Sequence, residues 1–120
     1  MPEAILSRVS DGVATVTLNR PEKRNALNTA ALDGLAKCVD QLEADASVRV
    51  VVIRGEGKAF CSGVDLRELS SHHGSDDSEA IALEVFGRLE RSRHPTIAMV
   101  HGDALAGGCV LALHCDLRVA

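Results

Sequence analysis

Aromatic residues are scarce in this chain of 120 residues, which has two phenylalanines and neither tryptophan nor tyrosine. Proteins that bind single-stranded nucleic acid stack its bases on aromatic side chains, so this scarcity argues against that class. Positive charge is not in excess either, because 17 acidic residues face 13 lysines and arginines. Without a basic stripe, nucleic acid is not an expected partner.

Long apolar runs are also missing. No stretch approaches the roughly 20 residues that a membrane-spanning helix needs, so no membrane partner is expected. The N-terminal residues 1–4 lack the basic start and the long apolar core of a signal peptide. We therefore expect a cytoplasmic protein, although a mitochondrial protein that has lost its transit peptide would have the same features.

The cysteines show no metal-binding or redox spacing. None forms a C-x-x-C pair, and no histidine lies at zinc-finger spacing from them. Buried, reduced thiols are the interpretation that this pattern favours, for Cys38, Cys61, Cys109 and Cys115. The neighbouring His72 and His73 sit in a polar, turn-rich stretch, and adjacent residues rarely chelate one ion, so no metal site is predicted.

Alternating helical and extended patterns predict an α/β fold. Asp11-Gly12 between two β-prone runs, 4–9 and 13–18, predicts a hairpin. A helix follows from position 28 or 29 to about 46, then a strand over 48–53 whose continuous apolar character suggests burial on both faces. A second helix is expected over 78–92, and further strands over 96–101 and from 115 to 119.

Periodic apolar residues identify the faces that these helices should bury. In the first helix the stripe consists of Leu32, Leu35, Val39, Leu42 and Ala46. In the second it consists of Ile81, Val85 and Leu89, with Phe86 beside them.

Two glycine-containing loops each follow an apolar strand and lead into a helix. The first is Phe60-Cys61-Ser62-Gly63-Val64-Asp65, and the second spans 102–108. Neither matches a dinucleotide fingerprint or a P-loop, and Phe60 excludes a nucleophile elbow around Ser62. The first N–H groups of a helix have no internal partner, so those of Val64 and Gly107 could form an oxyanion hole. The alternative is two ordinary strand-to-helix turns.

A polar loop with three cations, Arg20, Lys23 and Arg24, precedes the first helix. It is either a solvated turn or a patch for an anionic group such as a phosphate.

Five segments together resemble the enoyl-CoA hydratase/isomerase (crotonase) superfamily, in order and over nearly the whole chain. They are residues 19–28, 50–55, 60–66, 102–108 and 115–118. The resemblance implies an α/β crotonase-like spiral of ββα units, assembled as a homotrimer or homohexamer. It also implies an acyl-CoA substrate and no separate cofactor, because coenzyme A arrives as part of that substrate.

Site residues follow from the same resemblance. It places the oxyanion donors at Val64 and Gly107. It places the residues that line the acyl-CoA site at Arg24, Ala26, Leu27, Ser62, Gly63, Asp65, Leu66 and Arg67.

The acid or base that selects the reaction is not evident. Hydratases of this family carry a glutamate where this chain has Val110, so the resemblance is closer to enoyl-CoA isomerases, which use a single downstream carboxylate. Double-bond migration needs only one base that removes and returns a proton, whereas hydration usually uses two groups. Four further residues are weaker candidates, each with a structural alternative: Glu68, Glu84, His101 and Asp103.

The last residues, 117–120, fall within an expected core strand. We therefore expect residues 1–120 to be the N-terminal part of an acyl-CoA-binding domain, interrupted within its core. Two hypotheses remain: an acyl-CoA-processing enzyme that stabilises a thioester enolate, and a non-catalytic CoA-binding or assembly fragment that lacks the downstream carboxylate.

Overall fold

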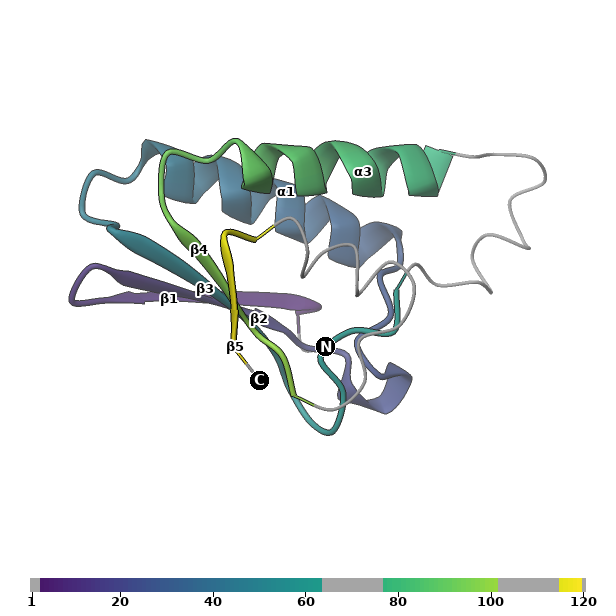
Figure 1. Ribbon diagram of the computed structural model, residues 1–120. Coiled ribbons are helices and arrows are strands. Elements are labelled where there is room, and N and C mark those ends of the chain that lie inside the picture. The colour runs from purple at the N-terminus through teal and green to yellow at the C-terminus, as the bar shows by residue number, and fades with distance from the viewer. Residues whose placement is uncertain (1–2, 64–76, 102–114, 120) are drawn as a thin grey trace.

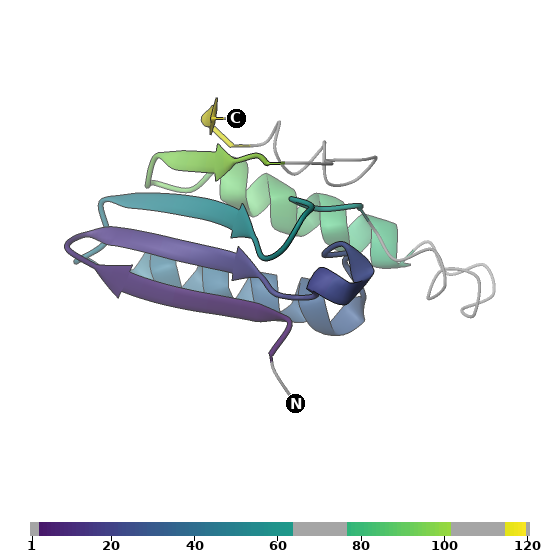
Figure 2. The same cartoon turned by 90° about the horizontal axis from the view of Figure 1, so that it is seen from below.

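The computed structural model describes residues 3–63, 77–101 and 115–119. They form one five-stranded sheet whose strands follow one another in chain order (Figures 1 and 2). The first two strands are antiparallel and every later neighbour is parallel. The strands are β1 (Ile5–Ser10), β2 (Val13–Leu18), β3 (Val50–Gly55), β4 (Thr96–Met99) and β5 (Leu117–Val119).

The hairpin that the sequence predicts is confirmed. β1 and β2 pair from Ile5 opposite Leu18 to Ser10 opposite Val13. Asp11 and Gly12 between them both have positive φ, 53° and 82°, the backbone geometry of a tight hairpin turn.

Helix α1 (Thr29–Ala44) begins where its capping residue predicts. The side chain of Asn28 accepts a hydrogen bond from the N–H of Ala31 at 2.9 Å. The helix ends two residues before the predicted position, because Asp45 turns out of the helix and accepts from the N–H and hydroxyl of Ser47. Ala46 is therefore exposed rather than part of the buried stripe, which comprises Ala31, Leu32, Leu35, Cys38, Val39 and Leu42.

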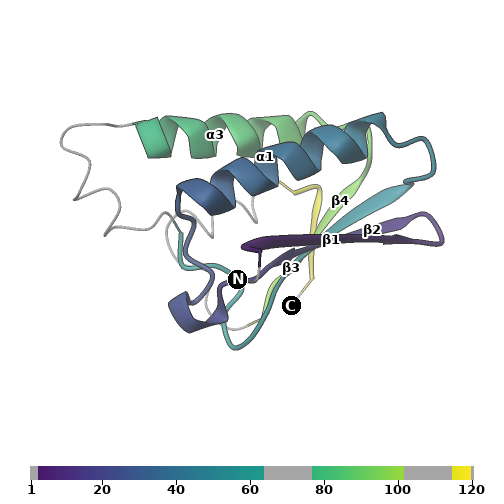
Figure 3. The same cartoon turned by 180° about the vertical axis from the view of Figure 1, so that it is seen from behind.

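Helix α3 (Asp77–Glu90) lies beside α1 over the same face of the sheet (Figures 1 and 3). Its buried face is made by Ala82, Val85, Phe86 and Leu89. The prediction for Ile81 was wrong, since this side chain is 37% exposed. Ile81 lies about 100° around the helix from Ala82, at the flank of the buried face.

The prediction that β3 is buried on both faces was also wrong. Val51 and Ile53 are buried, whereas Val50 and Val52 on the opposite face are only half-buried. The described helices both cover one face of the sheet, which accounts for this alternation. None of the helices within the described ranges is long and apolar enough to cross a membrane.

Strand β3 starts two residues later than the sequence suggests, because its partner is short. β2 begins at Val13, opposite Val50, so no strand lies beside Val48. The N–H groups of Arg49 and Val50 donate instead to the carbonyl of Gly12, at 2.7 and 3.2 Å.

Candidate active site

The candidate site is built on two loops that leave neighbouring strands. One follows β2 and runs through residues 19–28, and the other follows β3 and runs through residues 56–63. β2 and β3 are parallel, so both loops emerge at the same edge of the sheet. The topology brings these loops together, and with them five of the predicted site residues: Arg24, Ala26, Leu27, Ser62 and Gly63.

The first loop bends back on itself through a single turn of 3-10 helix, Pro21–Lys23. Arg24 and Asn25 follow it in the left-handed conformation, with φ of 52° and 58°. The backbone N–H of Asn25 donates to the carbonyl of Arg20 at 2.8 Å and closes the loop. This reversal turns the carbonyls of Arg24 and Asn25 toward the second loop.

Backbone hydrogen bonds join the two loops directly. The N–H of Ser62 donates to the carbonyl of Arg24 at 3.0 Å, and the N–H of Leu27 donates to the carbonyl of Gly63 at 2.7 Å. Gly63 has φ of 95°, a conformation that residues with a Cβ rarely adopt. The predicted site residues in the described ranges are thus assembled in one place: Arg24, Ala26, Leu27, Ser62 and Gly63.

The other predicted site residues lie outside the described residues. These are Val64, Asp65, Leu66, Arg67 and Gly107. The same holds for Val110, for the weaker candidates Glu68 and Asp103, for His72 and His73, and for Cys109.

The leucine of the predicted binding loop contributes through its backbone. The side chain of Leu27 is 1% exposed and belongs to the hydrophobic core. Burial of this side chain anchors the loop, while the backbone N–H of Leu27 donates to the carbonyl of Gly63.

The three cations of the first loop do not act alike. Arg20 is half-buried, and its guanidinium donates to the carbonyl of Ala26 at 2.5 Å. Lys23 and Arg24 are exposed beside it. Arg20 therefore helps to shape the loop, and Lys23 and Arg24 place positive charge on the surface beside it.

Asn25 is a residue of the candidate site that sequence reasoning missed. Its side chain is 1% exposed and bonds to both loops. The only signal in the sequence is an asparagine in a polar loop, and asparagine is common in exposed turns. Its burial depends on contacts with residues more than 30 positions away.

The cysteines of the described ranges are buried free thiols, as the sequence predicts. Burial raises the pKa of Cys61 to about 11, although the N–H of Gly63 donates to its sulfur and acts to lower it. Burial also raises the pKa of Cys115 to about 11. Thiols of this kind stay protonated at neutral pH, so neither is an activated nucleophile.

Two weaker acid/base candidates are engaged in structural contacts. His101 shares a 2.6 Å hydrogen bond with the carbonyl of Gly57, which confirms it as a hydrogen-bonded residue. Glu84 is 60% exposed and pairs with Arg88 on the surface of α3, so it does not line the two loops. Within the described part of the chain, no group of histidine, cysteine or carboxylate side chains could hold a metal ion.

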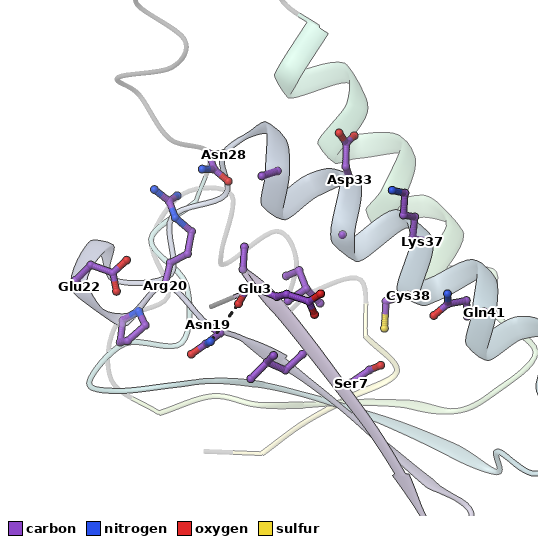
Figure 4. A pocket seen from close by; sticks show the side chains of 16 residues that line it. Glu3, Ser7, Asn19, Arg20, Glu22, Asn28, Asp33, Lys37, Cys38 and Gln41 are labelled. Carbon is purple, nitrogen blue, oxygen red and sulfur yellow. Dashed lines mark hydrogen bonds between the residues drawn. The ribbon is translucent and has the colours of Figure 1, made fainter. Parts of the chain in front are cut away.

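A separate groove of about 1270 Å³ lies between β1 and α1 (Figure 4). Ser7 on β1 and Cys38 on α1 lie on opposite sides of this groove. Arg20 lies at its end, but Ser62 and Gly63 do not line it. This groove is therefore distinct from the place where the two loops meet and bring the predicted residues together.

Comparison with known proteins gives a consistent answer. The family model for Enoyl-CoA hydratase/isomerase matches residues 8–120. A Bacillus subtilis (strain 168) protein described as a probable enoyl-CoA hydratase is 41% identical over 120 residues, which cover 98% of this chain and 46% of that protein.

Solved structures agree in fold. An enoyl-CoA hydratase from Mycobacterium smegmatis superimposes with a TM-score of 0.91 at 41% identity, over 96% of this chain and 46% of its own. An enoyl-CoA hydratase/isomerase from Xanthobacter autotrophicus Py2 gives 0.89 at 40% identity, over 96% and 45%. The chain thus spans about half the length of the relatives that it matches.

Proposed function

The chain belongs to the enoyl-CoA hydratase/isomerase family, and from this premise we propose that it binds an acyl-CoA thioester and stabilises the enolate of that thioester. Its α/β fold is that of the crotonase-like structures. The observation that carries the proposal is the pair of backbone bonds, Ser62 to Arg24 and Leu27 to Gly63, that join the two loops. They join Arg24 to Ser62 and Leu27 to Gly63, four of the residues that the resemblance assigns to the acyl-CoA site.

The proposed chemistry centres on two backbone N–H groups, those of Val64 and Gly107. Preorganised donors of this kind stabilise the negative charge that develops on a thioester oxygen when a neighbouring proton is removed. Support comes from Gly63, whose positive φ and fixed carbonyl define the peptide group that leads into Val64. A planar peptide group cannot turn its N–H independently of its carbonyl.

The CoA portion of the substrate is proposed to lie along the first loop. Arg24, with Lys23 beside it, offers exposed positive charge to the phosphates. Ala26 and Leu27 supply backbone, and Ser62, Gly63, Asp65, Leu66 and Arg67 complete the wall that faces the acyl group. No separate cofactor is required, because coenzyme A arrives on the substrate.

We propose double-bond migration in an enoyl-CoA as the reaction, with hydration as the alternative. Migration needs one base, which removes a proton to give the enolate and returns it at another carbon. Val110 stands where hydratases of the family carry a glutamate, which favours migration. The Bacillus subtilis relative is described as a hydratase, which favours hydration. Assaying 2-enoyl-CoA and 3-enoyl-CoA substrates side by side separates the two, and substantial hydration would overturn the preference for migration.

Substitution of Gly107 tests the oxyanion hole. Gly107→Pro removes the proposed N–H, and removing one such donor lowers kcat by about 10²- to 10³-fold. Gly107→Ala keeps the N–H and is the matched control for altered side-chain volume. A folded Gly107→Pro protein with unchanged turnover would refute the assignment.

A non-catalytic CoA-binding role is the second candidate, and the observation behind it is that the chain spans about half the length of its relatives. Titration with acetyl-CoA, with turnover measured in parallel, decides between the two. Binding without turnover supports the binding role, and turnover excludes it. We also propose a homotrimer or homohexamer, which light scattering on the purified chain would test.

A further inference from the structure

The side chain of Asn25 uses every hydrogen-bonding group that it has. Its oxygen accepts from the N–H of Arg20 at 2.8 Å, within the first loop. Its amide nitrogen donates to the carbonyls of Glu56 and Ala59, at 2.9 and 2.8 Å, in the second loop. An amide has two N–H protons, and here each has its own carbonyl.

The backbone of Asn25 continues the same connection. Its carbonyl accepts a hydrogen bond from the thiol of Cys61 at 3.3 Å, and that sulfur in turn accepts from the N–H of Gly63 at 3.3 Å. The side chain and the carbonyl together contact the second loop at both of its ends. Such a network is buried and fully satisfied, the condition under which polar groups specify one geometry.

We propose that Asn25 is a positioning residue for the enolate-stabilising chemistry of this site, an inference that rests on the proposed function. By fixing the spacing between the loops, Asn25 keeps the N–H of Leu27 within reach of the carbonyl of Gly63. That carbonyl shares a planar peptide group with the following N–H, so holding one sets the direction of the other. The donor is then oriented before substrate binds, and no reorganisation is needed during the reaction.

Few residues can replace asparagine at this position. The backbone φ of 58° is left-handed, a conformation that asparagine, aspartate and glycine tolerate better than other residues. Aspartate has the right shape, but an ionised carboxylate cannot donate to two carbonyls. Glycine keeps the backbone conformation and removes only the side chain, so Asn25→Gly isolates the hydrogen bonds.

The first test measures whether the hydrogen bonds of Asn25 hold the two loops together, a role called the clamp below, and it does not depend on catalysis. Amide hydrogen exchange at Ser62 and Leu27 should be at least about 10-fold faster in Asn25→Gly, because opening of the loops becomes easier. Val39→Ala, in the core on α1, is the control that lowers stability without touching the loops. Unchanged exchange at Ser62 and Leu27 in Asn25→Gly refutes the clamp, whether or not the protein is an enzyme.

The second test measures whether Asn25 positions the catalytic N–H group. Asn25→Gly should lower kcat by about 10²-fold, as expected for a small displacement of a catalytic group, with a much smaller change in KM. If faster local exchange is accompanied by the same kcat as in Val39→Ala, Asn25 only stabilises the fold. If wild-type protein neither binds acetyl-CoA nor converts enoyl-CoA, the proposed function fails, while the exchange result still decides the clamp.

A pH profile of Asn25→Asp provides a signature that a purely structural role would not give. A carboxyl buried between carbonyl oxygens has a raised pKa, and only its protonated form can donate a hydrogen bond. The kcat of Asn25→Asp relative to wild type should therefore rise as the pH falls. A ratio that is independent of pH would overturn the role assigned to the donated bonds.

Discussion

Gly55 offers the sharpest test of how the two loops are packed. A Cβ at this position would lie 2.4 Å from the carbonyl oxygen of Phe60 and 2.7 Å from that of Ala59. It would also lie 2.8 Å from the side-chain nitrogen of Asn25. Real Cβ atoms do not make contacts this short, and two of the three atoms are backbone, so Gly55→Ala forces the second loop to move.

The cost follows from the size of that movement. To reach an ordinary contact of 3.4 Å, the oxygens of Phe60 and Ala59 must retreat by about 1.0 and 0.7 Å. The second of these oxygens accepts from Asn25 at 2.8 Å, so the same retreat weakens a buried hydrogen bond. Overpacking costs about 1–3 kcal/mol and a weakened buried bond about 1 kcal/mol or more, so we expect a loss of about 3 kcal/mol.

Urea denaturation of Gly55→Ala and wild type measures this loss by linear extrapolation. Gly34→Ala is the matched control, because its Cβ would meet only the side chain of Ile5, at 3.1 Å. Alanine also has a helix propensity about 1 kcal/mol better than glycine, which offsets that contact. If Gly55→Ala lost no more stability than Gly34→Ala, the close approach of the loops at this position would be wrong.

Three further results are expected. Asn28→Ala should lower the free energy of unfolding by about 1 kcal/mol, measured in urea, because α1 loses its N-terminal cap. The urea midpoint of Arg88→Ala should differ from that of wild type only at low salt, because the ion pairs of Arg88 with Glu84 and Asp40 are exposed. A difference in midpoint that persists at high salt would contradict this. Cys61 keeps its proton to a pKa of about 11 when folded and to 9.0 when unfolded, so stability should fall as pH rises through this range. In denaturation measured at several pH values, the free energy of unfolding of Cys61→Ala should fall less steeply over the same range.

The fold could be predicted from the sequence wherever a local signal was sufficient. The bounds of the strand over 13–18, the turn at Asp11-Gly12 and the cap at Asn28 all come from short-range chemistry. Errors occurred where a distant partner decides the outcome. β3 begins at Val50 because β2 offers no earlier partner, and Ile81 is exposed because α3 packs through a neighbouring face.

The site divides in the same way. The types of residue in each loop, and the need for glycine at position 63, could be recognised from the sequence. The sequence could not show that Arg20 donates to the carbonyl of Ala26 in its own loop, since this bond depends on the reversal of the chain. It could not show the role of Asn25 either, because the carbonyls of Glu56 and Ala59 become its partners only when β2 and β3 pair.

The way in which the loops are held together has a consequence for how the site should fail. Apolar burial stabilises the sheet and the helices and also anchors each loop, through Leu27 in the first and Phe60 in the second. The two loops are joined to each other by directional bonds around one asparagine side chain and a few peptide groups. Losing one such bond displaces a donor by a fraction of an ångström, which matters to a reaction but little to a core. Core substitutions such as Val39→Ala should therefore lower stability and leave kcat unchanged. Substitutions at Asn25 should lower kcat by more than the change in stability explains. If core substitutions and Asn25 substitutions of equal effect on stability changed kcat equally, Asn25 would have no separate role in positioning the loops.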